Sequence, residues 1–435
     1  MDAVTTSSTS GAVAANRPGG FAARTLDGDA LDRALVDAHE RTWALLADLA
    51  PSQWAVPYNP GINPPLWECS HVAWFTEWWV LREGYWNENG ELVTKRPSLL
   101  ANADRWFDSG RVPHVDRWTL DLPPQGALRE YAAAVLDNVR AKLRAGNGEG
   151  PYPFRLALFH ADMHGEALTY MRQTLDYSTP VLGDLPARLA GGAPVRDVDR
   201  ALIANDAVKA DDAAMADDAA MASGRFTLGS RDDGAFVFDN EKWAHEVTLG
   251  PTRIARRCVT NAEYAAFVDA GGYADRRLWS DAGWAWRGER ELAHPQRWRK
   301  RSDGGWEERW FGAWRPLAER RPVCHVSAHE AEAFCRWAQR RLPCEAEWER
   351  AAVAGAIEWG HGGWEWTADA FLPYPGFSPD RYRDYSQPWF ATHRSVRGGS
   401  FATVARMHHP RYRNFYLPER NDIFVGFRTC ALDAR

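Results

Sequence analysis

The sequence predicts a protein of two parts, an N-terminal α-helical bundle followed by a domain of mixed α+β structure. The chain has 435 residues, enough for two or three domains with their own cores. Before residue 190 apolar residues recur at helical spacing, whereas the later half has short alternating runs with many Gly and Trp residues. We therefore expect a disordered tail (1–21), a four-helix bundle (22–190), a linker (191–224) and an α+β domain (225–435).

The bundle is expected to contain four helices, with one long crossover between the second and the third. Asp29 is a candidate N-cap for the first helix, and Pro51 follows its end. Pro65 suits the first turn of the second helix, where a missing N–H costs nothing. The expected ranges are 29–49, 66–82, 125–144 and 153–177.

The second half begins after an Ala/Asp-rich repeat, 210–221, which we expect to be a mobile linker. Two helices are predicted beyond it, at 327–340 and 345–354. The rest of this half is expected to be loop-rich α+β structure.

Composition excludes several classes of function. The net charge is −6 and the pI about 6.1, so no broad basic surface indicates a nucleic-acid partner. No apolar run approaches the roughly 20 residues that span a bilayer, and the N-terminal tail lacks the apolar core of a signal peptide. The six cysteines are scattered without a C-x-x-C motif, which is typical of reduced thiols in a cytoplasmic protein.

The most informative stretch is 159–166, FHADMHGE, in the fourth predicted helix. His160 and His164 are four residues apart, so they stack on one helix face and can bind one metal ion. His71 in the second helix is a candidate third ligand. Imidazole suits iron, zinc and copper, and ligand type alone does not separate them. The alternative is two histidines on a solvated face.

The C-terminal half contains a set of short phrases that together span most of it: FDNE (238–241), VTNAEY (259–264), RLPCEAEWE (341–349), WEWT (364–367), RGGS (397–400) and GFR (426–428). With these phrases it resembles the formylglycine-generating-enzyme/sulfatase-modifying-factor family, which implies a C-type-lectin-like α+β fold. The N-terminal half resembles DinB-like four-helix bundles. The two in this order resemble the ergothioneine synthase group of non-haem iron enzymes.

That resemblance implies Fe(II) held by His71, His160 and His164, with about three of six coordination positions left for dioxygen and two substrates. Enzymes of this group join a chalcogen donor to carbon 2 of the imidazole of hercynine, Nα,Nα,Nα-trimethylhistidine.

The departures from that group bear on the donor. Met163 stands where thiol-using relatives have a Gln that contacts the substrate imidazole. In the crossover only Arg105, Arg111 and Arg117 remain as candidates to hold donor carboxylates. The stretch 413–416 reads RNFY where relatives have RNWD, so the Asp that pairs with the donor's ammonium is replaced by Tyr416.

These replacements favour a neutral donor such as a sugar, and the chain resembles the selenoneine synthase branch. That branch forms a C–Se bond between hercynine and a 1-seleno-sugar. The alternative is ergothioneine synthesis with a thiol donor such as γ-glutamylcysteine or cysteine. A formylglycine-generating oxidase is a further alternative, although Cys430 has no evident partner cysteine for a copper site. A lectin-like binding module is the last.

The resemblance also suggests roles for other residues. A tyrosine hydroxyl is the expected proton or electron donor, and the candidates are Tyr374, Tyr382 and Tyr385. Phe415 and Tyr416 are candidates for the aromatic wall around the trimethylammonium group, and Asn414 and Arg413 for its carboxylate. Each could equally be an ordinary buried residue. Glu166 is expected to orient a ligand histidine or to lie exposed on the helix.

Overall fold

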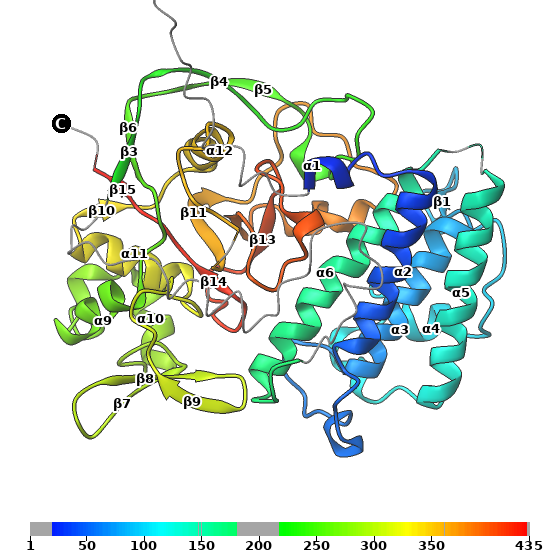
Figure 1. Ribbon diagram of the computed structural model, residues 1–435, viewed down its shortest axis with the longest axis horizontal. Helices are drawn as coiled ribbons and strands as arrows, with labels where there is room; N and C mark the ends of the chain where they lie inside the picture. Colours follow the sequence, from blue (N-terminus) through cyan, green and yellow to red (C-terminus); the bar gives the residue numbers. More distant parts are fainter. Residues whose placement is uncertain (1–19, 147, 149, 181–216, 361, 433–435) are drawn as a thin grey trace, which may run out of the picture.

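The structure, a computed structural model, has a helical N-terminal region and a β-rich C-terminal region that pack against each other along one long helix (Figure 1). It describes residues 20–146, 148, 150–180, 217–360 and 362–432. Most of the predicted tail lies outside these residues. Its last two residues, Gly20 and Phe21, belong to a short helix, α1 (Gly20–Ala23).

The helical region contains all four predicted long helices, which pack together. The first begins earlier than expected, because the Asp27 side chain, and not that of Asp29, accepts a hydrogen bond at its N-terminus from the N–H of Gly28. The second predicted helix is α3 (Pro65–Thr76), which continues into a π-helical turn, Glu77–Leu81. The helix bounds are α2 Gly28–Ala44, α3 Pro65–Thr76, α4 Ala103–Phe107, α5 Gln125–Ala145 and α6 Tyr152–Thr174.

The β-rich region is built from short strands joined by long loops and a few helices. One four-stranded sheet has the order β10-β15-β6-β3 and another the order β13-β12-β11-β14, in which β11 and β14 run parallel. The strands are β3 Asp218–Met221, β4 Gly224–Leu228, β5 His245–Leu249, β6 Thr252–Ala255, β7 Trp298–Lys300, β8 Trp306–Trp310, β9 Ala313–Pro316, β10 Arg340–Arg341, β11 Trp364–Ala370, β12 Arg394–Arg397, β13 Asn414–Tyr416, β14 Val425–Gly426 and β15 Cys430–Ala431; β1 Tyr85–Trp86 and β2 Leu92–Val93 form a hairpin in the helical region.

Both helices predicted in the second half are present, each slightly shorter than expected. Ser327 caps the first of them by accepting a hydrogen bond from the N–H of Glu330, and Glu330 bonds back to the N–H of Ser327. The helices of this region are α9 Asn261–Asp269, α10 Asp281–Glu289, α11 Ala328–Trp337 and α12 Glu345–Val353.

The predicted linker is too long at its C-terminal end. Residues 181–216, which include most of it, lie outside the described residues, but Asp218–Met221 forms β3 and pairs antiparallel with β6. Ala219 is buried there, and the Asp218 carboxylate accepts a hydrogen bond from Arg340 at 2.7 Å. Strand pairing with a distant segment thus overrides the low β propensity of the Ala/Asp repeat.

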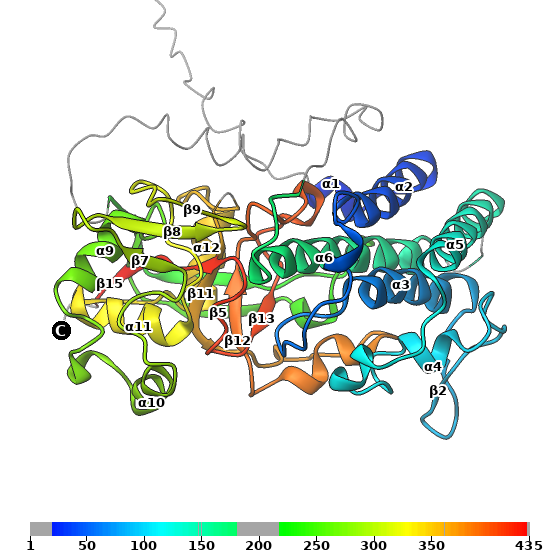
Figure 2. The ribbon, with the colours of Figure 1, turned by 90° about the horizontal axis from the view of Figure 1, so that it is seen from below.

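The two regions share one hydrophobic core. Phe159 on α6 lies 4.9 Å from Phe236, measured between ring centroids, and 5.7 Å from Phe238. Figure 2 shows α6 lying between the other bundle helices and the strands of the β-rich region. A helix in that position is covered on nearly all sides, which explains why no residue of α6 is exposed. No helix among the described residues is both long and apolar enough to cross a membrane.

We predict that Glu83, which follows the π-helical turn, stabilises the helical region in a pH-dependent way. Hydrogen bonds from Lys142 and Lys95 lower the pKa of the Glu83 carboxyl to about 2. Its contribution should be complete above the ordinary Glu pKa of about 4.5 and be lost as the pH falls towards 2. In urea unfolding, Glu83→Gln should lower the free energy of unfolding by about 1 kcal/mol at pH 7. The difference from the wild type should shrink between pH 4.5 and 2; a constant difference across that range would contradict the assignment.

Candidate metal centre

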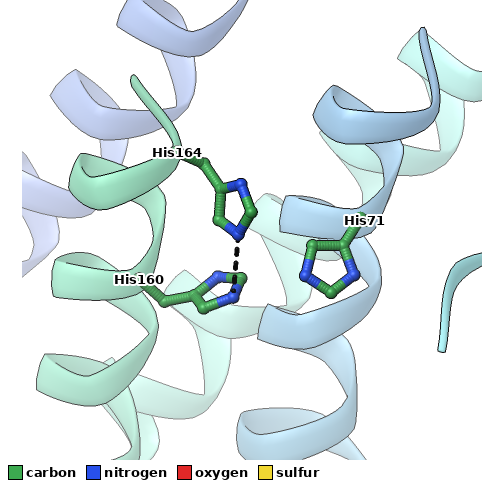
Figure 3. Close-up of side chains that lie close together, drawn as sticks. All are labelled: His71, His160 and His164. Atoms are coloured by element: carbon green, nitrogen blue, oxygen red, sulfur yellow. Dashed lines mark hydrogen bonds between the residues drawn. The ribbon is translucent and has the colours of Figure 1, made fainter. Parts of the chain in front are cut away.

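Three histidines from two helices converge at one point. His71 comes from α3, and His160 and His164 come from successive turns of α6 (Figure 3). One ligand nitrogen from each ring lies within 4.8 Å of the others. The structure therefore brings together the three residues whose joint role the sequence could only suggest.

Two of the three rings are held in a defined orientation. His71 Nδ1 lies 2.8 Å from the carbonyl oxygen of Phe107, and His164 Nδ1 lies 2.7 Å from the Glu68 carboxylate. Carbonyl and carboxylate oxygens only accept hydrogen bonds, so both Nδ1 atoms donate and both Nε2 lone pairs are free to bind a metal. The Nε2 atoms of His160 and His164 are 3.2 Å apart. A dashed line joins them in Figure 3.

Burial keeps the His71 and His160 rings neutral. Desolvation, followed by the influence of the neighbouring histidines, lowers the pKa of His71 and of His160 well below the ordinary value. A neutral imidazole presents the lone pair that metal binding requires.

Aromatic side chains enclose two of the ligands. The Trp67 indole stacks on His71 at 4.9 Å between ring centroids, and the Phe75 ring stacks on His160 at 3.5 Å. Trp74 lies against His71 from the next turn of α3. These rings fix the imidazoles sterically and limit the access of water from the α3 side.

The donor set fits a divalent transition metal. Three neutral imidazoles on one side leave the remaining positions open, as in catalytic sites that bind water, dioxygen or substrate. Among the described residues this is the one cluster of three or more His, Cys, Asp or Glu residues with metal-ligand geometry. Zinc, iron and copper remain compatible with the geometry.

The three candidate tyrosines lie at different distances from this centre. The Tyr382 ring is 6.4 Å from His160 and 4.9 Å from Phe75, measured between centroids. The Tyr385 ring lies 6.3 Å from the Tyr382 ring, measured between centroids. Its hydroxyl is 3.3 Å from that of Tyr412. Tyr374 lies elsewhere, beneath the Arg413 guanidinium at 3.9 Å.

Arg413 and Phe415 make their contacts with residues other than the three histidines. The Arg413 guanidinium is buried and donates to both Glu345 carboxylate oxygens and to the carbonyls of Asn240 and Leu372. The Phe415 ring stacks on Phe371 at 4.2 Å. In this structure Arg413 thus forms a buried ion pair and Phe415 packs on Phe371, and their contacts with hercynine stay a prediction.

Asn414 and Tyr416 lie on the other face of β13, because side chains alternate along a strand. The Asn414 amide donates to the Tyr416 hydroxyl at 3.2 Å. The Arg420 guanidinium lies over the rings of both Tyr416 and Tyr170 of α6, at 5.7 and 5.9 Å. Tyr170 is two turns after Met163 on the same face of α6, so this face of β13 meets the helix that carries the ligands.

Glu166 has neither of the roles predicted for it. It is buried, and it accepts hydrogen bonds from Trp364 Nε1 at 2.8 Å, Ser400 Oγ at 2.5 Å and Thr403 Oγ1 at 2.6 Å. These donors come from the β-rich region, two of them from the phrases WEWT and RGGS. Glu166 therefore joins the two regions, because the helix face that carries it is covered by the second region.

Sequence reasoning missed the two groups that orient the histidines. Glu68 is three residues before His71 on α3, and helical spacing was the signal that placed it on the same side. The Phe107 carbonyl gave no signal, because it comes from the irregular crossover.

We predict that replacing Glu166 by Ala lowers the free energy of unfolding by about 2–4 kcal/mol, because it leaves three buried donors without an acceptor. Urea unfolding of the full chain measures this. Glu130→Ala, an exposed site on α5, is the control and should cost less than about 0.5 kcal/mol. Equal effects of the two substitutions would show that the Glu166 contacts contribute no stability.

Comparison with known proteins agrees with this architecture. Residues 204–363 match the sulfatase-modifying factor enzyme 1-like domain family. The chain is 33% identical to the hercynine oxygenase of Mycolicibacterium thermoresistibile, over 92% of this chain and 94% of that protein. It is 32% identical to the hercynine oxygenase of Mycolicibacterium smegmatis, over 90% of this chain and 96% of that protein. The formylglycine-generating enzyme of Streptomyces coelicolor is 30% identical over 48% of this chain and 87% of its own length. Because the similarity to the first two spans both the helical and the β-rich regions, the chain belongs to the hercynine oxygenase family.

Proposed function

We propose that this protein is an iron(II)- and dioxygen-dependent enzyme that joins the selenium of a 1-seleno-sugar to carbon 2 of the hercynine imidazole. The observation that carries the proposal is the convergence of His71, His160 and His164, with Nε2 lone pairs facing one point. Membership of the hercynine oxygenase family supports hercynine and dioxygen as substrates. We also propose that the helical region is a DinB-like bundle, that the β-rich region has a C-type-lectin-like fold, and that the protein is cytoplasmic.

The chain's own residues would hold the metal, exclude water and supply a proton. Bound iron(II) would supply the redox chemistry and open coordination positions that a reaction with dioxygen needs. Trp67 and Phe75 would keep water from two of the ligands. Burial raises the pKa of Tyr382, so its hydroxyl keeps a proton at neutral pH. That hydroxyl has no hydrogen-bond partner within the described part of the chain, which leaves it available to a substrate.

Two arginines, Arg413 and Arg420, already have carboxylate partners, which supports a neutral donor. Arg413 is paired with Glu345, and Arg420 donates two hydrogen bonds to Asp422, at 2.5 and 2.7 Å. Both cations therefore have their countercharge within the protein. On the face of β13 that meets α6, the uncharged polar groups are the Asn414 amide and the Tyr416 hydroxyl. Both suit the neutral hydrogen bonds of a sugar.

One observation favours the second candidate, ergothioneine synthesis with a thiol donor. Arg117 lies over Trp67 at 4.1 Å, next to the His71 ligand, and forms no ion pair with any described carboxylate. It donates to Asn63 at 2.8 Å, and its buried Nε has no partner. A guanidinium in this state could bind a donor carboxylate. Arg105 and Arg111, the other crossover candidates, are exposed.

A competition assay separates the two donors. The purified iron(II) protein is given hercynine under air with a 1-seleno-sugar, γ-glutamylcysteine and cysteine together, and products are identified by mass spectrometry. We expect the C–Se product to dominate. Higher kcat/KM for a thiol donor would establish the second candidate. Arg117→Gln adds a check, because it should raise KM for γ-glutamylcysteine about tenfold or more if Arg117 binds a carboxylate, and leave KM for the seleno-sugar unchanged.

Removing one ligand tests the metal centre itself. His160→Ala should lose most of its bound iron, because two remaining imidazoles form a much weaker site. Metal analysis after anaerobic reconstitution measures this. His39→Ala, a histidine on α2 outside the cluster, is the control and should bind iron like the wild type. Full iron occupancy in His160→Ala would contradict the assignment.

We predict that Tyr382→Phe lowers kcat about 10²-fold or more, because it removes the proposed proton donor. The iron content should remain unchanged, since Tyr382 is not a ligand. Tyr385→Phe is the matched control; its hydroxyl bonds to Tyr412, and a smaller loss is expected. Wild-type kcat in Tyr382→Phe would exclude this role.

A further inference from the structure

Glu68 occupies an unusual position for a carboxylate. It lies in the first turn of α3, three residues before the ligand His71, and its side chain is only 2% exposed. Its Oε1 accepts a hydrogen bond from Nδ1 of a different ligand, His164, at 2.7 Å. One helix thus supplies a metal ligand and the group that orients a second ligand on another helix.

The charge of Glu68 has no fixed cation beside it. Among the residues that the structure describes, His164 is the one basic side chain in contact with it, through a hydrogen bond, and Arg117 acts on it only at longer range. Other buried acids nearby are matched differently. Asp162 forms an ion pair with Arg406, and Glu166 accepts three hydrogen bonds. A buried carboxylate without a cation destabilises the folded protein. The charge of Glu68 is therefore compensated only when a positive charge lies on the far side of His164.

The three ligands are also unequal. His71 donates to a neutral carbonyl, and His160 Nδ1 is buried with no partner in the described structure. Only His164 donates to a carboxylate. A charge-assisted hydrogen bond at Nδ1 increases the electron density at Nε2 and makes that imidazole a stronger donor to a metal.

We infer that Glu68 is the countercharge of the bound divalent metal and the positioning residue of His164. This inference rests on the proposed metal centre and adds to it. Glu68 compensates one of the two positive charges that three neutral imidazoles leave uncompensated, and it transmits that compensation through the His164 ring. Metal affinity in this protein is therefore set by a fourth residue that does not touch the metal.

The test uses Co(II), which reports on its ligands through visible absorption, in the full-length apoprotein under anaerobic conditions. Glu68→Gln keeps an oxygen that can accept from His164 Nδ1 but removes the charge, and Glu68→Ala removes both. We expect Co(II) affinity to fall 10–100-fold in Glu68→Gln and at least as much in Glu68→Ala. We also expect the absorption bands of bound Co(II) to shift in both variants.

Glu77→Gln is the matched control. Glu77 is equally buried, on the π-helical turn that continues α3, but it accepts from Ser98, Leu99 and Tyr131 and contacts no ligand. It should bind Co(II) within about twofold of the wild type with an unchanged spectrum, even if its thermal stability falls.

The outcomes are distinct. Wild-type affinity and spectrum in Glu68→Gln would overturn the countercharge role, and the same result in Glu68→Ala would overturn the positioning role too. Equal losses in Glu68→Gln and Glu77→Gln would also overturn the inference, since they would reflect general destabilisation. If the wild type binds no Co(II), or His160→Ala binds it as well as the wild type, the metal centre itself is wrong and this inference falls with it.

Discussion

The geometry of the metal centre depends on how helix α6 is fixed against the β-rich region. Glu166, two residues after the ligand His164, accepts three hydrogen bonds from Trp364, Ser400 and Thr403. Asp162, between the two α6 ligands, is bound by Arg406 of the same region, which also binds Asp37 of α2. These buried polar contacts allow little rotation of α6, because any slippage would leave donors and charges unpaired. The second region thus sets the direction in which His160 and His164 point.

Helix α3 completes the site from the opposite side. It supplies His71 as a ligand, Glu68 as the partner of His164, and the rings of Trp67 and Phe75 that pack on His71 and His160. Because these residues follow one another within three turns of a rigid helix, their relative positions are fixed by backbone geometry. The dense aromatic packing around the ligands explains part of the high tryptophan content, 23 residues in 435.

The arginines around the metal centre differ in whether their charge is paired, and this bears on the proposed reaction. The similarity to two hercynine oxygenases covers both the helical and the β-rich region of the chain. Arg413 and Arg420 are neutralised by Glu345 and Asp422, whereas Arg117 forms no ion pair with a described carboxylate. In the function proposed above, the choice between a neutral and an anionic donor rests on these few residues.

The amino-acid sequence was enough to predict the helices of the bundle, the H-x-x-x-H pair on α6 and the family of the second half, because helical periodicity, ligand spacing and local phrases are properties of neighbouring residues. His71 could be proposed as third ligand through resemblance, but its convergence with the others required the packing of α3 on α6. Other features became visible in the folded chain alone: Glu166 joins the two regions, Glu68 orients His164, Tyr382 and not Tyr374 lies near the ligands, and Asp218–Met221 is a strand. Each of these is a contact between segments far apart in the chain, and the direction of a side chain across such a contact is set by the packing of whole elements.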